Sequence, residues 1–196
     1  GDGWAVGMDY LDDSMVTDVK LANPSLKLNI NCSDLVDFHE NIYLKRITVE
    51  NLSDKQRQVR LFFHQDFHIS GNDIGDTAAF RPEVNAMLHY KGDRYFLVNA
   101  YSKNKTGFDQ YATGEKERGS IQGTWKDAED GVLSGNPIAQ GSVDSVIAVH
   151  LDIKPKSREE CYYWISAAAN WDDACTLDNI ITQKTPQAIF KRTYDY

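Results

Sequence analysis

Apolar and polar residues alternate with a period of two over most of the stretch from residue 14 to residue 69, which is typical of half-buried β-strands. Two short alternating segments, 15–21 and 26–31, are separated by Asn23-Pro24, a dipeptide that favours a turn. A third segment covers 41–51, and in it the Lys45-Arg46 pair interrupts the alternation and predicts a bulge or twist. Its apolar residues are predicted to lie near one face: Ile42, Leu44, Ile47 and Val49.

Short polar turns divide the next part of the chain into paired strands. The turn 52–55 lies between the strand 41–51 and a second strand at 56–69, and this arrangement predicts a β-hairpin. A second hairpin is predicted from the strand 77–90, the turn Lys91-Gly-Asp-Arg94 and the strand 95–101. Pro82 lies within the first of these two strands, so an edge position or a break is expected there.

The chain changes character twice after residue 101. Residues 101–141 hold seven of the 13 glycines, which predicts a long elaborated loop with short strands at 108–113 and around Trp125. Strand patterns return at 142–153 and 160–170, and helical patterns follow at 172–184 and 185–196. Thr185 is a suitable cap for the last helix, and Pro186 suits its first position. Many strands followed by terminal helices predict a mainly β fold, a sandwich of two sheets with a helical tail.

Composition and charge narrow the class of protein. A chain of 196 residues fits one domain, or one domain with a short appendage. Its 41% hydrophobic and 26% charged residues are ordinary for a soluble globular domain. The formal net charge of −8, without a block of Lys and Arg, argues against nucleic acid and anionic membrane as partners. The sequence has no apolar run near the ~20 residues that a membrane-spanning helix needs.

Three cysteines, at positions 32, 161 and 175, form an odd and widely spaced set. This spacing predicts neither a disulfide framework nor a zinc site, so buried reduced thiols and a reducing cytoplasm are favoured. The first residues, "GDGWAVG", are typical of a cut into a longer chain and leave a preceding signal peptide open.

The first candidate site is His64-x-Asp66-x-His68. A spacing of two on a strand points these side chains to one face, and two imidazoles with a carboxylate can hold a catalytic metal. The alternative is a polar strand face packed against loops or a second module, and it is favoured because a distant partner motif is lacking. The segment 71–77 is acidic and flanked by glycines, but it lacks the regular ligands of a calcium loop, so a structural turn is expected.

The second candidate site is Trp125, which lies among acidic residues that include Asp127 and Asp130. Its ring can stack on a sugar whose hydroxyls the acids bind, or it can hold the long loop onto the core. Trp164 and Trp171 are expected in the core. The sequence contains neither a nucleophile elbow, a phosphate-binding loop, a zinc-protease motif nor a dinucleotide fingerprint, and it singles out no acid–base pair among its 29 acidic residues.

Three blocks in order, 41–100, 124–146 and 185–196, resemble a known module. They are similar to the N-terminal β-sandwich domain of prokaryotic glucoamylase-like and glucodextranase-like enzymes of glycoside hydrolase family 15. The resemblance implies a two-sheet supersandwich, like that of galactose mutarotase, over residues 1–184. It also implies that further strands precede the equivalent of Trp4, so that part of a sheet is missing here.

The same resemblance implies that residues 185–196, with Thr185, Pro186, Tyr194 and Tyr196, begin a linker helix to an absent (α/α) toroid. In the family that toroid carries the two glutamates that hydrolyse α-glucosidic bonds with inversion. The expected partners are therefore the protein's own catalytic domain and, through it, an α-glucan. The resemblance places neither a catalytic residue, a metal nor a cofactor on this chain. Trp125, Asp127, Asp130, His64, Asp66 and His68 are thus candidates for substrate binding or for a domain interface.

A self-standing sugar-binding or mutarotase-like sandwich is the alternative hypothesis. A mutarotase needs a general acid and a general base, typically His and Glu, in an open cleft. Four histidines are available, but the sequence pairs none of them with a glutamate: His64, His68, His89 and His150. A run of helices encoded after residue 196 would select the first hypothesis, and a stop codon would select the second.

Overall fold

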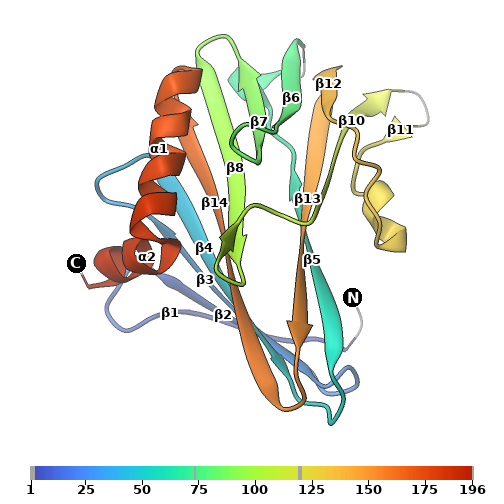
Figure 1. Ribbon diagram of the computed structural model, residues 1–196, viewed down its shortest axis with the longest axis vertical. Coiled ribbons are helices and arrows are strands. Elements are labelled where there is room, and N and C mark those ends of the chain that lie inside the picture. Colours follow the sequence, from blue (N-terminus) through green and yellow to red (C-terminus); the bar gives the residue numbers. More distant parts are fainter. Residues whose placement is uncertain (1–2, 73, 119–120, 196) are drawn as a thin grey trace.

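The computed structural model describes residues 3–72, 74–118 and 121–195, so Asp73 and Tyr196 lie outside the described residues. Two antiparallel sheets of unequal size form the fold (Figure 1). The large sheet has ten strands, in the order β1 (Ala5–Tyr10), β2 (Thr17–Asn23), β3 (Leu28–Val36), β4 (Ile42–Asn51), β14 (Ser157–Ala168), β8 (Arg94–Ser102), β7 (Ala86–Lys91), β6 (Asp76–Arg81) and β12 (Ile138–Gly141), with β9 (Lys105–Thr106) paired to β8.

The small sheet packs against one face of the large sheet. Its strands follow the order β11 (Ile121–Gln122), β10 (Gln110–Arg118), β13 (Val143–Ile153) and β5 (Arg57–Gln65). Two short 3-10 turns accompany it, η1 (Ile69–Gly71) and η2 (Asp127–Asp130). The main core lies between the sheets and joins apolar residues of β13, such as Ile147 and Leu151, to those of β4, β7 and β8, such as Val49, Met87 and Val98. This burial is the principal source of stability for the sandwich.

Two helices cover the opposite face of the large sheet, α1 (Trp171–Lys184) and α2 (Pro186–Tyr194) (Figure 1). A second core forms there between the sheet residues Leu44 and Trp164 and the helix residues Ile181, Ile189 and Phe190. The mainly β fold predicted from the sequence, two antiparallel sheets with short C-terminal helices, is therefore confirmed. Among the described residues, no helix has the length and apolarity required to cross a membrane.

The hairpin predicted from residues 41–69 is wrong, because its two strands belong to different sheets. Strand β4 pairs with β3 and β14, whereas β5 pairs with β13. The turn 52–56 is a corner between the sheets, and the Asn51 side chain fixes it by donating hydrogen bonds to the backbone oxygens of Lys55 at 2.8 Å and Lys154 at 3.1 Å. Both edges of β4 are already occupied, so β5 has to move to the other layer.

The bulge predicted at Lys45-Arg46 is also wrong. Strand β4 pairs with β14 in one continuous register, from Asn51 opposite Ser157 to Ile42 opposite Ser166. The apolar residues change faces because the strand is buried on both sides. Ile42 and Leu44 face the helices, whereas Ile47 and Val49 face the small sheet.

Two other regions test the sequence predictions. Pro82 breaks the segment 77–90 into β6 and β7, as expected, and these two strands pair with each other. The predicted hairpin of β7 and β8 across residues 91–94 is confirmed. The region 101–141 contains more than a loop, since β10 runs for nine residues and pairs with β13 over 110–115. The predicted strand around Trp125 is instead a turn that leads into η2.

The C-terminal segment docks on this domain. Thr185 caps α2 by accepting a hydrogen bond from the Ala188 backbone at 3.3 Å, as its position predicted. Ile189 and Phe190 are buried, and Arg192 forms an ion pair with the buried Asp37. The division of the chain at residue 185 and the linker role of α2 stay predictions.

Candidate functional site

The candidate site lies on the outer face of the small sheet, the face turned away from the large sheet. On β5 the odd-numbered residues Val59, Leu61 and Phe63 face the core, so His64 faces outward. The register places His64 opposite Val146 of β13, and Asp144, two residues earlier, lies diagonally beside it. The segment 123–136 folds over the rest of this face and packs Ala128 and Leu133 on the sheet.

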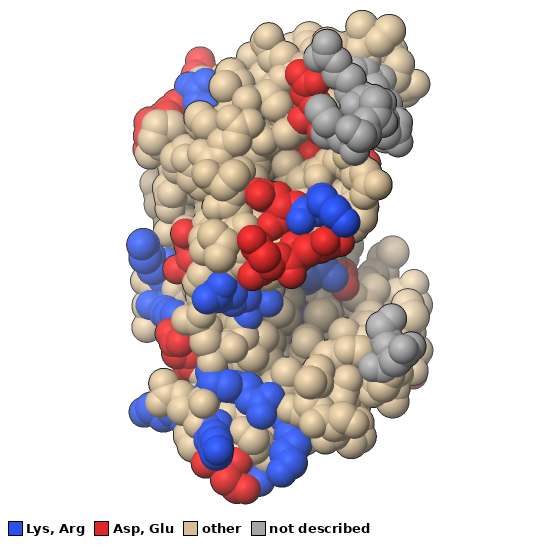
Figure 2. Space-filling model, turned by 90° about the vertical axis from the view of Figure 1, so that its right-hand side faces the viewer, with Lys and Arg blue, Asp and Glu red and all other residues tan. Residues whose placement is uncertain are grey.

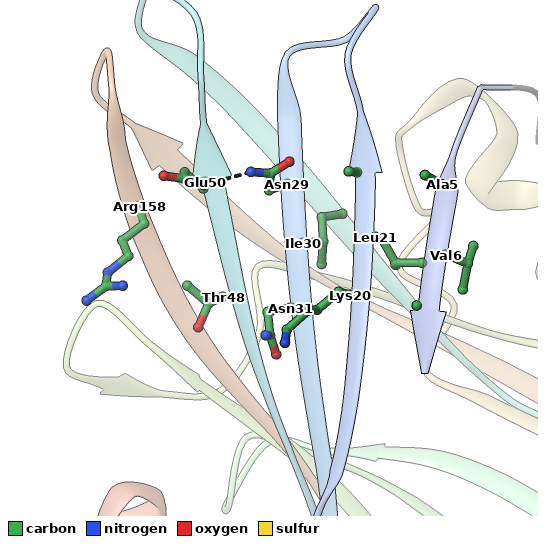
Figure 3. Close-up of a pocket in the computed structure, with 12 residues that line it drawn as sticks. Ala5, Val6, Lys20, Leu21, Asn29, Ile30, Asn31, Thr48, Glu50 and Arg158 are labelled. Carbon is green, nitrogen blue, oxygen red and sulfur yellow. Dashed lines mark hydrogen bonds between the residues drawn. The ribbon is translucent and has the colours of Figure 1, made fainter. Parts of the chain in front are cut away.

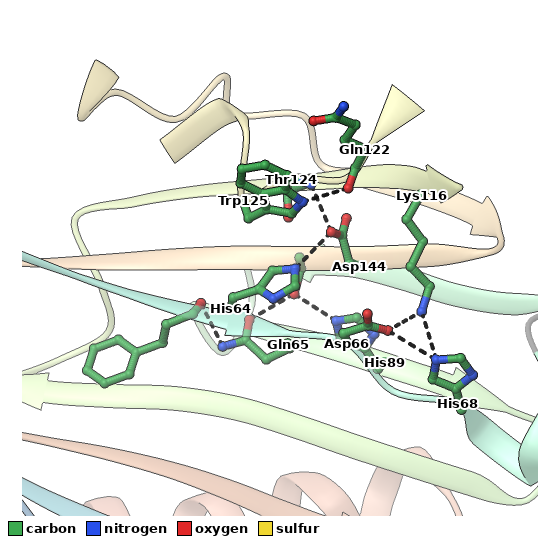
Figure 4. A network of polar contacts seen from close by, with 12 residues as sticks. His64, Gln65, Asp66, His68, His89, Lys116, Gln122, Thr124, Trp125 and Asp144 are labelled. Carbon is green, nitrogen blue, oxygen red and sulfur yellow. Dashed lines mark hydrogen bonds and ion pairs between the residues drawn. The ribbon is translucent and has the colours of Figure 1, made fainter. Parts of the chain in front are cut away.

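Asp144 is the central group of the site (Figure 4). Its side chain is 1% exposed, and its Oδ2 lies 2.8 Å from His64 Nε2. The same oxygen accepts a hydrogen bond from the Thr124 backbone at 2.8 Å. One carboxylate therefore fixes the orientation of the imidazole and ties the start of the covering segment to the sheet.

Two glycines make this close approach possible. A Cβ on Gly123 would lie 2.3 Å from Asp144 Oδ2, and Gly123 has a φ of +105°, which also favours glycine. A Cβ on Gly114, directly opposite Asp144 in the sheet, would lie 2.8 Å from the Thr124 methyl group. The site thus requires a residue without a side chain at both positions.

Asp66 and His68 lie beyond the end of β5 and form a separate group (Figure 4). The Lys116 side chain, only 4% exposed, forms an ion pair with Asp66, and its Nζ lies 3.4 Å from His68 Nε2. The distance from Asp66 Oδ1 to His68 Nε2 is 3.8 Å. The His-x-Asp-x-His motif is therefore split between two clusters, one around Asp144 and one around Lys116.

Metal binding was one interpretation of this motif. Among the residues that the structure describes, no three or more His, Cys, Asp and Glu side chains are grouped so that they could hold a metal ion. The Lys116 ammonium supplies the positive charge beside Asp66 that a cation would otherwise supply.

A second polar layer lies beneath the site, between the sheets. Ser145 donates to Gln65 Oε1 at 2.9 Å, and its Oγ lies 2.7 Å from His89 Nε2. Gln65 in turn donates toward the Tyr163 hydroxyl at 3.3 Å. Burial lowers the pKa of His89 to about 4, so this imidazole is neutral at physiological pH. It serves as a hydrogen-bonded core residue.

The Trp125 cluster is looser than the sequence suggested. Trp125 is 45% exposed, and its indole Nε1 donates to the Gln122 backbone oxygen at 2.7 Å. Asp127 accepts from the Ser134 backbone and Asp130 from the Val132 backbone, both at 2.8 Å, so these acids stabilise the turns of the covering segment. On this side of the molecule acidic side chains gather next to basic ones (Figure 2), and Lys126 pairs with Glu129 at 3.2 Å. Trp164 is fully buried, and Trp171 is partly buried beneath the Arg81 guanidinium.

In the acidic loop 71–77 the positive charge beside the carboxylate is a lysine side chain of the same chain. The Lys91 Nζ lies 3.0 Å from the buried Asp76 carboxylate, 3.0 Å from the Ile69 backbone oxygen and 2.7 Å from the Asn72 side-chain oxygen. A lysine ammonium thus gathers the oxygens of this turn, in keeping with the structural turn predicted from the sequence.

The sequence prediction missed Asp144, Lys116 and Thr124. A signal for Asp144 was present, because a charged residue lies within the mostly apolar run 143–149 of a buried strand. No comparable signal marked Lys116. The resulting arrangement can hold an imidazole and an indole in fixed positions on an open surface, which suits recognition of another molecule. It presents His64 with an orienting carboxylate.

Comparisons with known proteins place the fold among carbohydrate-active proteins. The chain is 25% identical over 156 residues, 79% of its length, to an uncharacterized glycosyl hydrolase of Methanocaldococcus jannaschii. A bacterial glucoamylase, solved in complex with acarbose, matches 99% of the chain with a TM-score of 0.75 and 12% identity. A putative kojibiose phosphorylase from the human microbiome matches 92% with a TM-score of 0.56 and 12% identity. No protein-family model matches.

These matches cover only part of each relative. The chain spans 24% of the archaeal protein, 28% of the glucoamylase chain and 22% of the phosphorylase chain. The fold is therefore one that occurs as a portion of larger carbohydrate-active proteins. The assignment to glycoside hydrolase family 15 goes beyond this finding.

Proposed function

We propose that this chain is a non-catalytic β-sandwich module of an inverting α-glucosidase, glucoamylase-like or glucodextranase-like, that acts on α-glucans. The names of the relatives support the carbohydrate class, and the share of each relative that the chain covers supports a module of a larger enzyme. The catalytic module that follows is its proposed partner, and α2 is the proposed start of the connection.

The observation that carries the non-catalytic role is the way the acids of the site are used. Inverting hydrolysis needs a general acid and a general base that face each other across the bond, with carboxyl groups about 6.5–9.5 Å apart. Here Asp144 is buried against His64 and the Thr124 backbone, and Asp66 is paired with Lys116. Each of these two carboxylates is engaged in holding part of the fold in place.

Exposed apolar residues support the presence of further protein around this domain. Val6, Met8 and Tyr10 on the edge strand β1 are 60%, 78% and 65% exposed. These three side chains point to the inner face of the large sheet, but the four-stranded sheet does not extend far enough to cover them. Additional strands or a neighbouring module would bury them. This surface fits the prediction that part of a sheet is missing from residues 1–184.

The proposal is tested in the longer enzyme with His64→Ala and Asp66→Asn. We expect kcat on short malto-oligosaccharides to stay within about twofold, whereas loss of a general acid or base costs about 10²–10⁴-fold. The exposed His39→Ala serves as the control, and thermal melting shows whether each variant is folded. A folded His64 or Asp66 variant with a hundredfold lower kcat would place catalysis on this domain.

A further inference from the structure

A groove crosses the outer face of the large sheet, on the side of the helices but beyond their cover (Figure 3). It consists of two adjoining hollows of about 570 and 600 Å³. The hollows share Asn31, Thr48 and Arg158, so they form one continuous depression. Its far end lies near α2, where the Arg46 guanidinium sits 4.2 Å from the centroid of the Phe190 ring.

The strand register organises the side chains of the groove into rows. One row crosses five neighbouring strands, from β1 to β14, and each member is the direct partner of the next: Ala5, Ala22, Asn29, Glu50 and Arg158. Directly paired residues point to the same face of a sheet, so the whole row faces the groove. Small residues at the β1 end leave an open floor, and polar residues occupy the β14 end.

A second row runs parallel to the first, two residues along each strand. Its members are again direct partners in the register: Gly7, Lys20, Asn31, Thr48 and Glu160. Four steps between strands at about 4.8 Å give each row a length of about 19 Å, with the two rows about 7 Å apart. These dimensions match an extended chain of several small rings better than one compact ligand.

The polar groups of the rows are held in position and keep unused hydrogen-bonding capacity. The Asn29 amide donates to Glu50 at 2.9 Å, and the Asn31 amide donates to Asp18 at 3.1 Å, so both side chains are fixed before a ligand arrives. Within the described residues, the Asn31 side-chain oxygen, the Thr48 hydroxyl and the Arg158 guanidinium have no protein hydrogen-bond partner. Two fixed amides beside a hydroxyl and a guanidinium with unused hydrogen-bonding capacity are suited to the vicinal hydroxyls of a polyol.

The charges of the groove argue against an ionic ligand. The residues that line it include three basic and three acidic side chains: Lys20, Arg46 and Arg158 with Glu50, Glu159 and Glu160. A phosphate or a polyanion would meet a carboxylate close to every cation. A neutral ligand rich in hydroxyl groups meets no such repulsion, because each hydroxyl can donate to a carboxylate and accept from a cation.

We propose that this groove binds a neutral oligosaccharide, laid across the strands from β1 to β14. The proposal rests on the proposed function for the choice of an α-glucan as the first ligand to test. It adds a binding site on the large sheet, separate from the His64 and Trp125 region on the small sheet. Because the floor is made of small residues and the contacts are hydrogen bonds, we expect weak binding, with a Kd of about 0.1–5 mM.

Amide chemical shifts of the isotope-labelled chain provide the test, with maltohexaose, isomaltohexaose and cellohexaose as probes. We expect saturable shifts in both rows for at least one probe. Arg158→Ala and Asn31→Ala should each weaken that binding about fivefold or more, as loss of one hydrogen bond to a charged or fixed group predicts. The matched controls are the exposed Arg94→Ala and Asn179→Ala, which should stay within about twofold, and melting temperatures confirm folding.

The absence of saturable shifts in the rows with all three sugars at about 10 mM would overturn the proposal, as would shifts confined to the Trp125 region. Stronger binding of inorganic phosphate than of any sugar would also overturn it. Binding of cellohexaose alone would support the groove but contradict an α-glucan as its ligand. The proposed function fails separately, through the turnover of the His64 and Asp66 variants.

Discussion

Replacing Lys91 by Met removes the cation around which the loop 69–76 is organised. The Asp76 carboxylate is 2% exposed, and once the ammonium is gone its one remaining hydrogen bond among the described residues is that from the Ile69 backbone at 3.3 Å. Loss of one partner of a buried ion pair costs about 3–5 kcal/mol, because the other charge stays buried without compensation. The Lys91 side chain is 20% exposed, so the lower end of this range, about 3 kcal/mol, applies.

For a domain of this size about 3 kcal/mol corresponds to a decrease in melting temperature of about 6–12 °C. The matched control is Lys103→Met, which breaks a surface pair with Asp152, 3.1 Å long and nearly half exposed at both ends. Such pairs contribute about 0–1 kcal/mol. The double variant Lys91→Met with Asp76→Asn should be more stable than Lys91→Met alone, since the unpaired charge is removed. Urea unfolding that shows the same loss for Lys91→Met and Lys103→Met would refute this reasoning.

Two further predictions concern the helices, and both depend on pH. Burial raises the pKa of Asp178, although hydrogen bonds from Trp164 at 2.9 Å and Asn99 at 3.2 Å act in the opposite direction. The protonated Asp178 carboxyl therefore contributes to folding stability below its ordinary pKa. This contribution is lost as the pH rises through the higher pKa of the folded state. Asp178→Asn should therefore gain stability relative to the wild type between pH 4 and pH 7 in urea unfolding, and a constant difference would contradict this. Burial also acts to raise the pKa of Asp37, but hydrogen bonds from Arg192 and Thr193 outweigh it and hold the pKa below its ordinary value. Asp37→Ala should speed amide exchange across residues 189–194 at neutral pH. In the wild type, protection of these amides should decrease as the medium is acidified. Fast exchange in the wild type at neutral pH would mean that α2 is not docked.

Local patterns predicted most of the elements but not their partners. The alternation along 15–31, and Thr185-Pro186 at the start of α2, act through neighbouring residues, so they could be interpreted directly from the sequence. The placement of β4 and β5 in different sheets depends on pairing with residues about a hundred positions away, such as Asn51 with Ser157. Local alternation carries no information about that choice.

In the candidate site, too, the local sequence pattern predicted the direction of a side chain but not its partners. The outward direction of His64 follows from its place in the alternation of β5, which the sequence supplied. Its partner Asp144 lies 80 residues away, and Lys116 lies 50 residues from Asp66. These pairs exist because β10 and β5 both flank β13 in the small sheet, and that order appears only in the three-dimensional structure.

The hydrolysis of maltose, soluble starch and dextran by the purified, isolated chain tests the non-catalytic role most directly. We predict the release of no more glucose than a heat-inactivated sample releases, because the acid and base of hydrolysis are proposed to lie on another module. The carboxylates of the site are committed to His64, Thr124 and Lys116. Turnover that persists through purification, and that Asp144→Asn or Asp66→Asn abolishes in a folded variant, would contradict the account.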